Sequence, residues 1–102
     1  MKFSMKKVTV LLADGFEEIE ALTVVDLLRR AKVYVDTVSI TDDYTVRGAH
    51  GIPVQTEDLI TEIDFKESDM IVLPGGMPGT TNLNAHEGVR RVVKDFAAEG
   101  KP

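Results

Sequence analysis

A glycine-rich stretch at residues 70–79 carries backbone groups that could take part in catalysis. Its apolar run stops at Pro74 and continues into the paired glycines Gly75 and Gly76. This pattern is typical of a buried strand that ends in a loop with exposed backbone. Because ligands bind at the carboxyl ends of parallel strands, we expect these N–H groups to hold an anion or a developing oxyanion.

A cluster of acidic side chains, Glu17, Glu18 and Glu20, is the second candidate. A carboxyl group near the mouth of a sheet could move protons during a reaction. Negative charge also stabilises the N-terminus of a helix, and we take this simpler explanation for Glu17 and Glu18. The two histidines, His50 and His86, are far apart in the sequence and form no recognisable metal motif.

The composition excludes several classes of chemistry. The 102 residues include no cysteine, so these residues alone can form no disulfide, zinc–thiolate site or thiol nucleophile. A net charge of −5 argues against nonspecific binding to DNA or to anionic membranes. Residues 1–7 lack the apolar core of a signal peptide, and no run is long enough to cross a membrane. We therefore expect a cytoplasmic protein.

The first half of the chain has the pattern of a β-α-β unit. Residues 7–13 are apolar at nearly every position, which predicts a strand covered on both faces. Asp14 and Glu17 have the spacing of a capping box, so we expect Asp14 to cap a helix that runs to about Arg30. Residues 34–40 form the second predicted strand.

The middle of the chain predicts an excursion from the main sheet. Residues 44–47 and 52–55 are short extended segments around a glycine-containing turn, and we interpret them as a hairpin. Residues 59–63 are interpreted as a short bridge, with a helical turn as one alternative. Residues 70–73 then form the third core strand, with Met70 in the core.

The last predicted element is an amphipathic helix. Asn84 and Glu87 have capping-box spacing, and apolar residues recur at helical intervals from Val89 onward. Gly100 suits the end of this helix. The pattern as a whole predicts an α/β fold, a doubly wound and mostly parallel sheet with helices on both faces. Three core strands would leave an apolar edge exposed, so we expect the chain to be incomplete, either as a fragment or because another chain supplies the missing strands. A minimal self-sufficient domain is the less favoured alternative.

Several of these motifs together resemble the ThiJ/PfpI family, which includes the parkinsonism-associated deglycase and belongs with the class I glutamine-amidotransferase-like folds. The matching stretches are residues 8–22, 25–31, 50–52 and 69–79, followed by Asn82 and Leu83. The resemblance covers nearly the whole chain from Lys6. It implies a flavodoxin-like fold, with residues 1–102 as the N-terminal part of a single domain that is incomplete in this chain, and a homodimer.

The resemblance also implies a cysteine-dependent enzyme that acts on small reactive carbonyls or their adducts without an added cofactor or metal. Members are described as glyoxalases, deglycases, peptidases or stress-response chaperones, and many carry the name thiazole monophosphate biosynthesis protein. A non-catalytic redox sensor or chaperone on the same fold remains an alternative. A nucleotide-binding module is disfavoured, because the first predicted βα turn has one glycine and is acidic.

Residue by residue, Glu20 matches the family's acidic residue beside the nucleophile, and Gly75 and Gly76 match its oxyanion loop. The Gly76 N–H is the expected donor. His50 lies in the segment that reaches the partner's site in family dimers. We assign Gly15, Met77 and His50 as candidate substrate-binding residues.

The family's nucleophilic cysteine would follow Pro102, so we expect the missing C-terminal part of the protein to act as a partner of this chain. Lys32 stands where the family usually has glycine, which implies left-handed backbone at a non-glycine residue.

Overall fold

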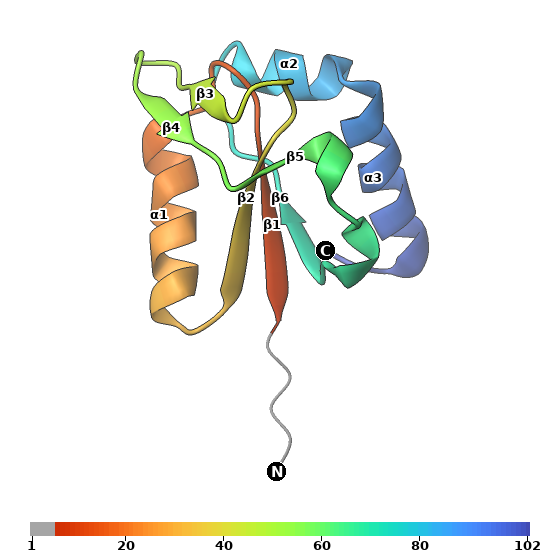
Figure 1. Ribbon diagram of the computed structural model, residues 1–102. Helices are drawn as coiled ribbons and strands as arrows, with labels where there is room; N and C mark the ends of the chain where they lie inside the picture. The colour runs from red at the N-terminus through yellow and green to blue at the C-terminus, as the bar shows by residue number, and fades with distance from the viewer. Residues whose placement is uncertain (1–5) are drawn as a thin grey trace.

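The computed structural model describes residues 6–102, so the N-terminal stretch considered above lies largely outside the described residues. The elements are β1 (Lys7–Leu12), α1 (Glu18–Arg30), β2 (Tyr34–Ser39), β3 (Thr45–Arg47), β4 (Pro53–Gln55), β5 (Asp58–Leu59), η1 (Ile60–Glu62), η2 (Phe65–Glu67), β6 (Met70–Val72), α2 (Gly79–Ala85) and α3 (Glu87–Glu99). Figure 1 shows α1 on one side of the sheet and α3 on the other.

The main sheet is parallel and has the strand order β5-β2-β1-β6. The predicted α/β fold is therefore confirmed, as is the separate antiparallel hairpin of β3 and β4. The prediction of three core strands was one short, because the two-residue strand β5 pairs with the end of β2. The short bridge predicted at residues 59–63 contributes Leu59 to this strand and then forms the 3-10 turn η1.

Both faces of β1 are buried, as its continuous apolar sequence predicts. Val8, Val10 and Leu12 pack in one core cluster with Ala21 and Val25 of α1. Leu11 and Ala13 belong to the opposite cluster, which contains Val89 of α3 and Leu83 of α2. Because successive side chains of a strand point to opposite faces, one strand supplies both clusters.

The start of α1 differs from the prediction that Asp14 caps it. Glu17 is the N-cap residue, and its carboxylate accepts a hydrogen bond from the Ile19 N–H at 3.1 Å. The Asp14 carboxylate instead accepts from the Arg47 N–H at 3.0 Å. The Asp14 side chain, which its spacing predicted to cap the helix, is thus bound to the backbone of β3 instead.

The segment before α3 also differs from the prediction. Asn84 lies inside α2, and His86 caps α3 by accepting a hydrogen bond from the Val89 N–H at its Nδ1 atom. The α3 helix itself is confirmed, with Val89, Val92 and Phe96 buried. Gly100 ends it in the left-handed conformation, with φ of 72°.

The β6 strand lies at one edge of the sheet, and the chain returns to that edge after α3. The Ile71 N–H donates to the Pro102 carbonyl at 3.1 Å. Met70 was predicted to lie in the core, but 36% of it is exposed. The reason is its place on an edge strand, where one side lacks a neighbouring strand.

Lys32 has a φ of 65°, which confirms the left-handed backbone implied by the family resemblance. We predict that Lys32→Gly raises the free energy of unfolding by about 0.5–1 kcal/mol, because glycine avoids the steric cost of this conformation. Urea unfolding measures the change. Lys66→Gly is the matched control, since Lys66 is also exposed but has negative φ. The prediction is wrong if both substitutions destabilise equally.

Candidate functional site

The loop after β6 is bound to the loop after β1 by backbone hydrogen bonds. The Glu17 N–H donates to the Gly75 carbonyl at 2.8 Å, and the Gly79 N–H donates to the Gly15 carbonyl at 3.0 Å. Gly76 has a φ of 103°, a conformation that glycine adopts more readily than other residues. The carboxyl ends of β1 and β6 thus form one rigid corner, as expected for adjacent parallel strands.

Glu20 lies beside this corner and faces Gly75. A methyl carbon placed on Gly75 would lie 2.9 Å from Oε1 of Glu20, so the carboxylate rests directly against the glycine backbone. Among the hydrogen bonds found within residues 6–102, none is donated by the N–H of Gly75 or Gly76. The structure therefore places a carboxylate against the backbone of Gly75, in a loop where the N–H groups of Gly75 and Gly76 donate no hydrogen bond within residues 6–102.

Met77 borders an apolar hollow next to the same loop. The hollow has a volume of about 640 Å³ and is lined by Leu73, Pro74, Gly75 and Met77 together with residues of α2 and α3. Met77 is exposed, and the Met77–Pro78 peptide bond is cis. Gly15 lines a different hollow of about 480 Å³ with Pro78 and residues of the hairpin. Two of the predicted substrate-binding residues thus line hollows on either side of one loop.

Glu18 is a central residue that the sequence analysis assigned only to helix stability. It is 4% exposed, and its Oε2 accepts hydrogen bonds from the N–H groups of His50 at 2.8 Å and Ile52 at 3.3 Å. Its Oε1 lies 2.8 Å from Nδ1 of His50. Glu18 therefore ties the β3–β4 turn to the first turn of α1. The turn's repeated small residues around His50 were the only sequence signal for this contact.

The contact between Glu18 and His50 shifts the pKa of both side chains. Burial alone would raise the pKa of Glu18, but hydrogen bonds from the His50 ring and from the N–H groups of Glu18, His50 and Ile52 outweigh it. The pKa of Glu18 falls to about 2. The hydrogen bond and negative charge of Glu18, with the charge of Glu17, raise the pKa of His50 above its usual 6.5.

Glu17, Glu18 and His50 also offer three possible metal-ligand atoms within 4.8 Å of one another. Both carboxylate oxygens of Glu18 are already occupied by the His50 ring and by backbone N–H groups. The cluster is therefore explained as a hydrogen-bonded anchor for the turn.

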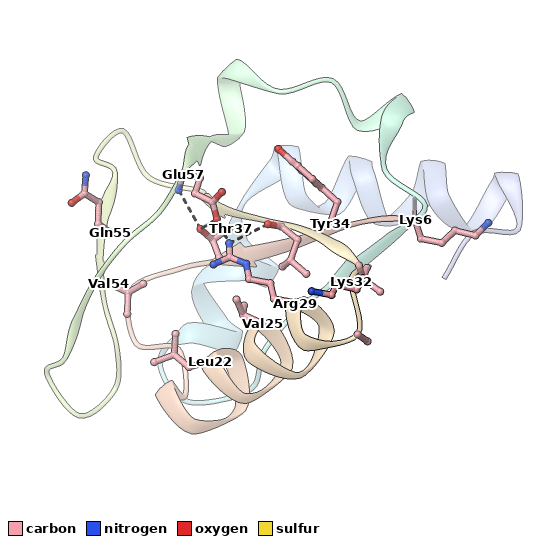
Figure 2. A pocket seen from close by; sticks show the side chains of 13 residues that line it. Lys6, Leu22, Val25, Arg29, Lys32, Tyr34, Thr37, Val54, Gln55 and Glu57 are labelled. Atoms are coloured by element: carbon pink, nitrogen blue, oxygen red, sulfur yellow. Dashed lines mark hydrogen bonds and ion pairs between the residues drawn. The ribbon is translucent and has the colours of Figure 1, made fainter. Parts of the chain in front are cut away.

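A third hollow, whose lining residues Figure 2 shows, does not include Glu20. It has a volume of about 1060 Å³ and an apolar floor of Leu22, Val25 and Val54 between α1 and the hairpin. Arg29 crosses it, donating to the Val35 carbonyl at 3.1 Å and pairing with the Glu57 carboxylate. These contacts cover the part of β2 that β5 does not pair with. The Glu57 carboxylate therefore has a structural partner in Arg29.

Comparisons with known proteins identify the family of this chain. A sequence model of the DJ-1/PfpI family matches residues 6–102. The chain belongs to the DJ-1/PfpI family. The resemblance deduced from the sequence is thereby confirmed, and so is the flavodoxin-like character of the fold that it implied.

The curated relatives include DJ-1 homolog B of Arabidopsis thaliana, which is 34% identical over 99% of this chain and 23% of the relative. A putative cysteine protease of Bacillus subtilis is 30% identical over 95% of this chain and 57% of its own length. This DJ-1/PfpI chain thus spans between 23% and 57% of the length of these two relatives.

Solved structures of the family agree closely with the fold. A cysteine-to-alanine mutant of a DJ-1 superfamily protein from Salmonella typhimurium has a TM-score of 0.89 and 40% identity, and the match covers 95% of this chain and 52% of that one. Oxidized DJ-1 of Toxoplasma gondii has a TM-score of 0.90 and 36% identity, with 94% and 52% covered.

Membrane spans were sought among the helices of residues 6–102. None of these helices is both long enough and apolar enough to span a bilayer.

Proposed function

We propose that this chain supplies the acid–base carboxyl and the oxyanion donors of a cysteine-dependent DJ-1/PfpI enzyme. The complete protein acts on small reactive carbonyl compounds or their adducts, in the manner of a glyoxalase or deglycase. One observation carries the proposal: the Glu20 carboxylate rests against Gly75, in the loop whose Gly75 and Gly76 N–H groups donate no hydrogen bond within residues 6–102. These groups lie where substrates bind in parallel α/β sheets.

The proposed first step adds a thiol across a carbonyl group. The thiolate of a cysteine attacks the carbonyl carbon, the C–S bond forms, and the π electrons of the carbonyl move onto its oxygen. The N–H of Gly76 donates to this oxyanion. Glu20 takes the thiol proton and then delivers it to the oxygen, which leaves a neutral hemithioacetal.

The nucleophile is proposed to come from polypeptide that follows this chain and completes its sheet. The Ile71 N–H donates to the Pro102 carbonyl at 3.1 Å, and this contact at the sheet edge formed by β6 supports the proposal. The Salmonella relative studied as a cysteine-to-alanine mutant supports a functional cysteine in that part of the family's fold. Residues 1–102 form, in this proposal, the N-terminal part of a single domain.

We further propose a homodimer built on the outer face of α1. Ile19 of α1 is 75% exposed, and Leu27 of α1 and Ile52 of the adjacent β3–β4 turn are also exposed. Burial of such side chains between two copies would be favourable. In this arrangement His50, at the tip of the adjacent turn, is available to the partner's site.

Hydrolysis of peptide bonds is a second candidate activity, which the likeness to the putative cysteine protease of Bacillus subtilis favours. The same three groups would act on a peptide carbonyl. A redox-sensing or chaperone role without catalysis is a third candidate, and the oxidized form of the Toxoplasma relative favours it. Parallel assays with methylglyoxal and with an unstructured peptide distinguish the two activities.

We predict that Glu20→Gln lowers kcat/KM for methylglyoxal by about 10²–10⁴-fold in the protein completed with its cysteine-bearing part, because proton transfer is lost. Consumption of methylglyoxal measures the effect, and residues 1–102 alone should show none. Glu17→Gln is the matched control, since it keeps the oxygen that accepts from the Ile19 N–H. Equal turnover in wild type and Glu20→Gln would exclude the role given to Glu20.

A further inference from the structure

The β3–β4 turn is held by a set of contacts that converge on one side chain. Glu18 accepts from the N–H groups of His50 and Ile52 and contacts the His50 ring. Its carboxyl group is packed so closely against Gly48 that a methyl carbon there would lie 2.3 Å from Cδ of Glu18. A side chain at position 48 would therefore displace the carboxylate, so the contacts of Glu18 with the turn require glycine at this position.

The turn is also connected to the loop that follows β1. The Ala49 N–H donates to the Phe16 carbonyl at 2.7 Å, and the Gly15 N–H donates to the Arg47 carbonyl at 2.8 Å. The turn cannot move without changing the loop that contains Gly15, which in turn binds Gly79. The position of His50 is thus coupled to the corner that carries Glu20.

The hydrogen-bond geometry determines the orientation of the imidazole ring. A carboxylate is only an acceptor, so Nδ1 of His50 carries the hydrogen in its 2.8 Å contact with Glu18. The His50 side chain is 67% exposed although Nδ1 is engaged, so the opposite edge of the ring, with Nε2, is open to solvent. When the ring is protonated, Nε2 is a charged donor.

We propose that Glu18 is a positioning residue: it holds the β3–β4 turn on α1 and orients His50 so that Nε2 faces outward, where it is a hydrogen-bond donor when the ring is protonated. The group that such a donor takes is an oxygen acceptor, a carboxylate or carbonyl of a small molecule or of a second copy of this chain. This role rests on the contacts of the turn and does not depend on the proposed reaction.

The charged groups around His50 determine the pH range in which Glu18 and His50 hold the turn in place. Glu17 and Glu18 face the ring from α1, and the Arg47 guanidinium of β3 donates to the Gly51 carbonyl of the same turn. The stabilising contribution of His50, whose pKa is raised, is complete below pH 6.5 and is lost as the pH rises through its folded pKa. That of Glu18 is complete above pH 4.5 and is lost as the pH falls toward about 2. The turn is held most firmly between these two limits.

Nuclear magnetic resonance of the ¹⁵N-labelled chain tests the proposal, because His50 and His86 are the only two histidines. In the wild type, His50 should titrate above its usual pKa and show the Nδ1–H tautomer when neutral. His86 should show the opposite tautomer, since its Nδ1 accepts from the Val89 N–H. His86 is therefore an internal reference in the same spectrum.

Glu18→Gln should lower the titration midpoint of His50 and reverse its tautomer. It should also accelerate exchange of the His50 and Ile52 amides by at least about tenfold, because their charged acceptor is gone. Glu17→Gln, with its carboxylate 3.9 Å from the ring, should cause a smaller shift and no reversal. Gly48→Ala keeps every charge but displaces the carboxylate, and should reproduce the loss.

Two results would overturn the proposal. One is a wild-type His50 with an ordinary pKa and the Nε2–H tautomer, which needs no variant and so does not depend on how well a variant folds. The other is an unchanged His50 titration and amide exchange in Glu18→Gln. Neither measurement involves turnover, so failure here is distinguishable from failure of the proposed enzymatic activity.

Discussion

Gly76→Ala is expected to destabilise the fold by about 3 kcal/mol or more, because the new methyl group meets backbone that cannot move aside. It would lie 2.5 Å from the Glu17 N atom and 3.0 Å from the Gly15 carbonyl oxygen. The φ of 103° adds the strain of a conformation that L-residues rarely adopt. Urea unfolding followed by circular dichroism measures the loss.

Gly51→Ala is the matched control for this substitution. Gly51 also has positive φ, at 80°, but a methyl group there meets nothing within 4 Å. Gly51→Ala should therefore lower the free energy of unfolding by about 1–2 kcal/mol, the cost of the positive φ alone. The difference between the two variants isolates the close packing of the loops after β1 and β6, and equal losses would mean that this packing is looser than the structure shows.

Asp36→Asn is expected to stabilise the protein at pH 8 by about 2–4 kcal/mol, while changing little at pH 4. Asp36 is 2% exposed, and its Oδ1 atom has no hydrogen-bond partner among residues 6–102. Burial, followed by the hydrogen bond and charge of Asp58 and the charge of Glu57, raises the pKa of Asp36 to about 7, against a smaller opposing effect of Lys7. An unpaired carboxylate in such a position is costly when ionised.

The sign of the pH dependence follows from the raised pKa. The folded state holds the Asp36 proton more tightly than the unfolded state, whose reference pKa is 3.8. The free energy of unfolding should therefore fall as the pH rises from about 4 to above 7, and this slope should disappear in Asp36→Asn. His50 contributes a slope of the same sign, which the variant retains. Asp26→Asn, at an exposed position of α1, is the control.

The register of the sheet explains why Asp36 meets Asp58. Asp58 pairs with Val38, and Asp36 lies two residues before Val38 on the same face of β2. The two carboxyl groups are thus neighbours on adjacent parallel strands. Their titrations are coupled, because ionisation of one disfavours ionisation of the other. A wild-type unfolding free energy that is flat between pH 5 and 8 would contradict this description.

Much of the framework was predictable because it depends on local patterns. The continuous apolar run of β1, the helical spacing of α3 and the glycine at its end each report burial or backbone conformation directly. The positive φ at Gly76 follows from glycine chemistry alone. The motifs that resemble the ThiJ/PfpI family pointed to Glu20 and Gly75, and the structure brings these two residues together.

The features that the sequence did not reveal depend on partners far along the chain. Asp14 and Glu17 have the spacing of a capping box, but Arg47 of β3 takes the Asp14 carboxylate. Glu18 looks like one more acid at a helix start, yet contacts from residues 32 and 34 positions away make it a buried anchor.

By itself, then, the sequence determined the α/β framework, the family and the corner that carries Gly75 and Gly76, since local periodicity and glycine placement encode backbone shape. Only the tertiary structure decided which acids are solvated and which are buried. Burial and hydrogen-bond partners arise from the pairing of strands and the docking of the turn. For this reason Glu20, Glu18 and Asp36, all acids of similar chemistry, have three different environments in one small fold.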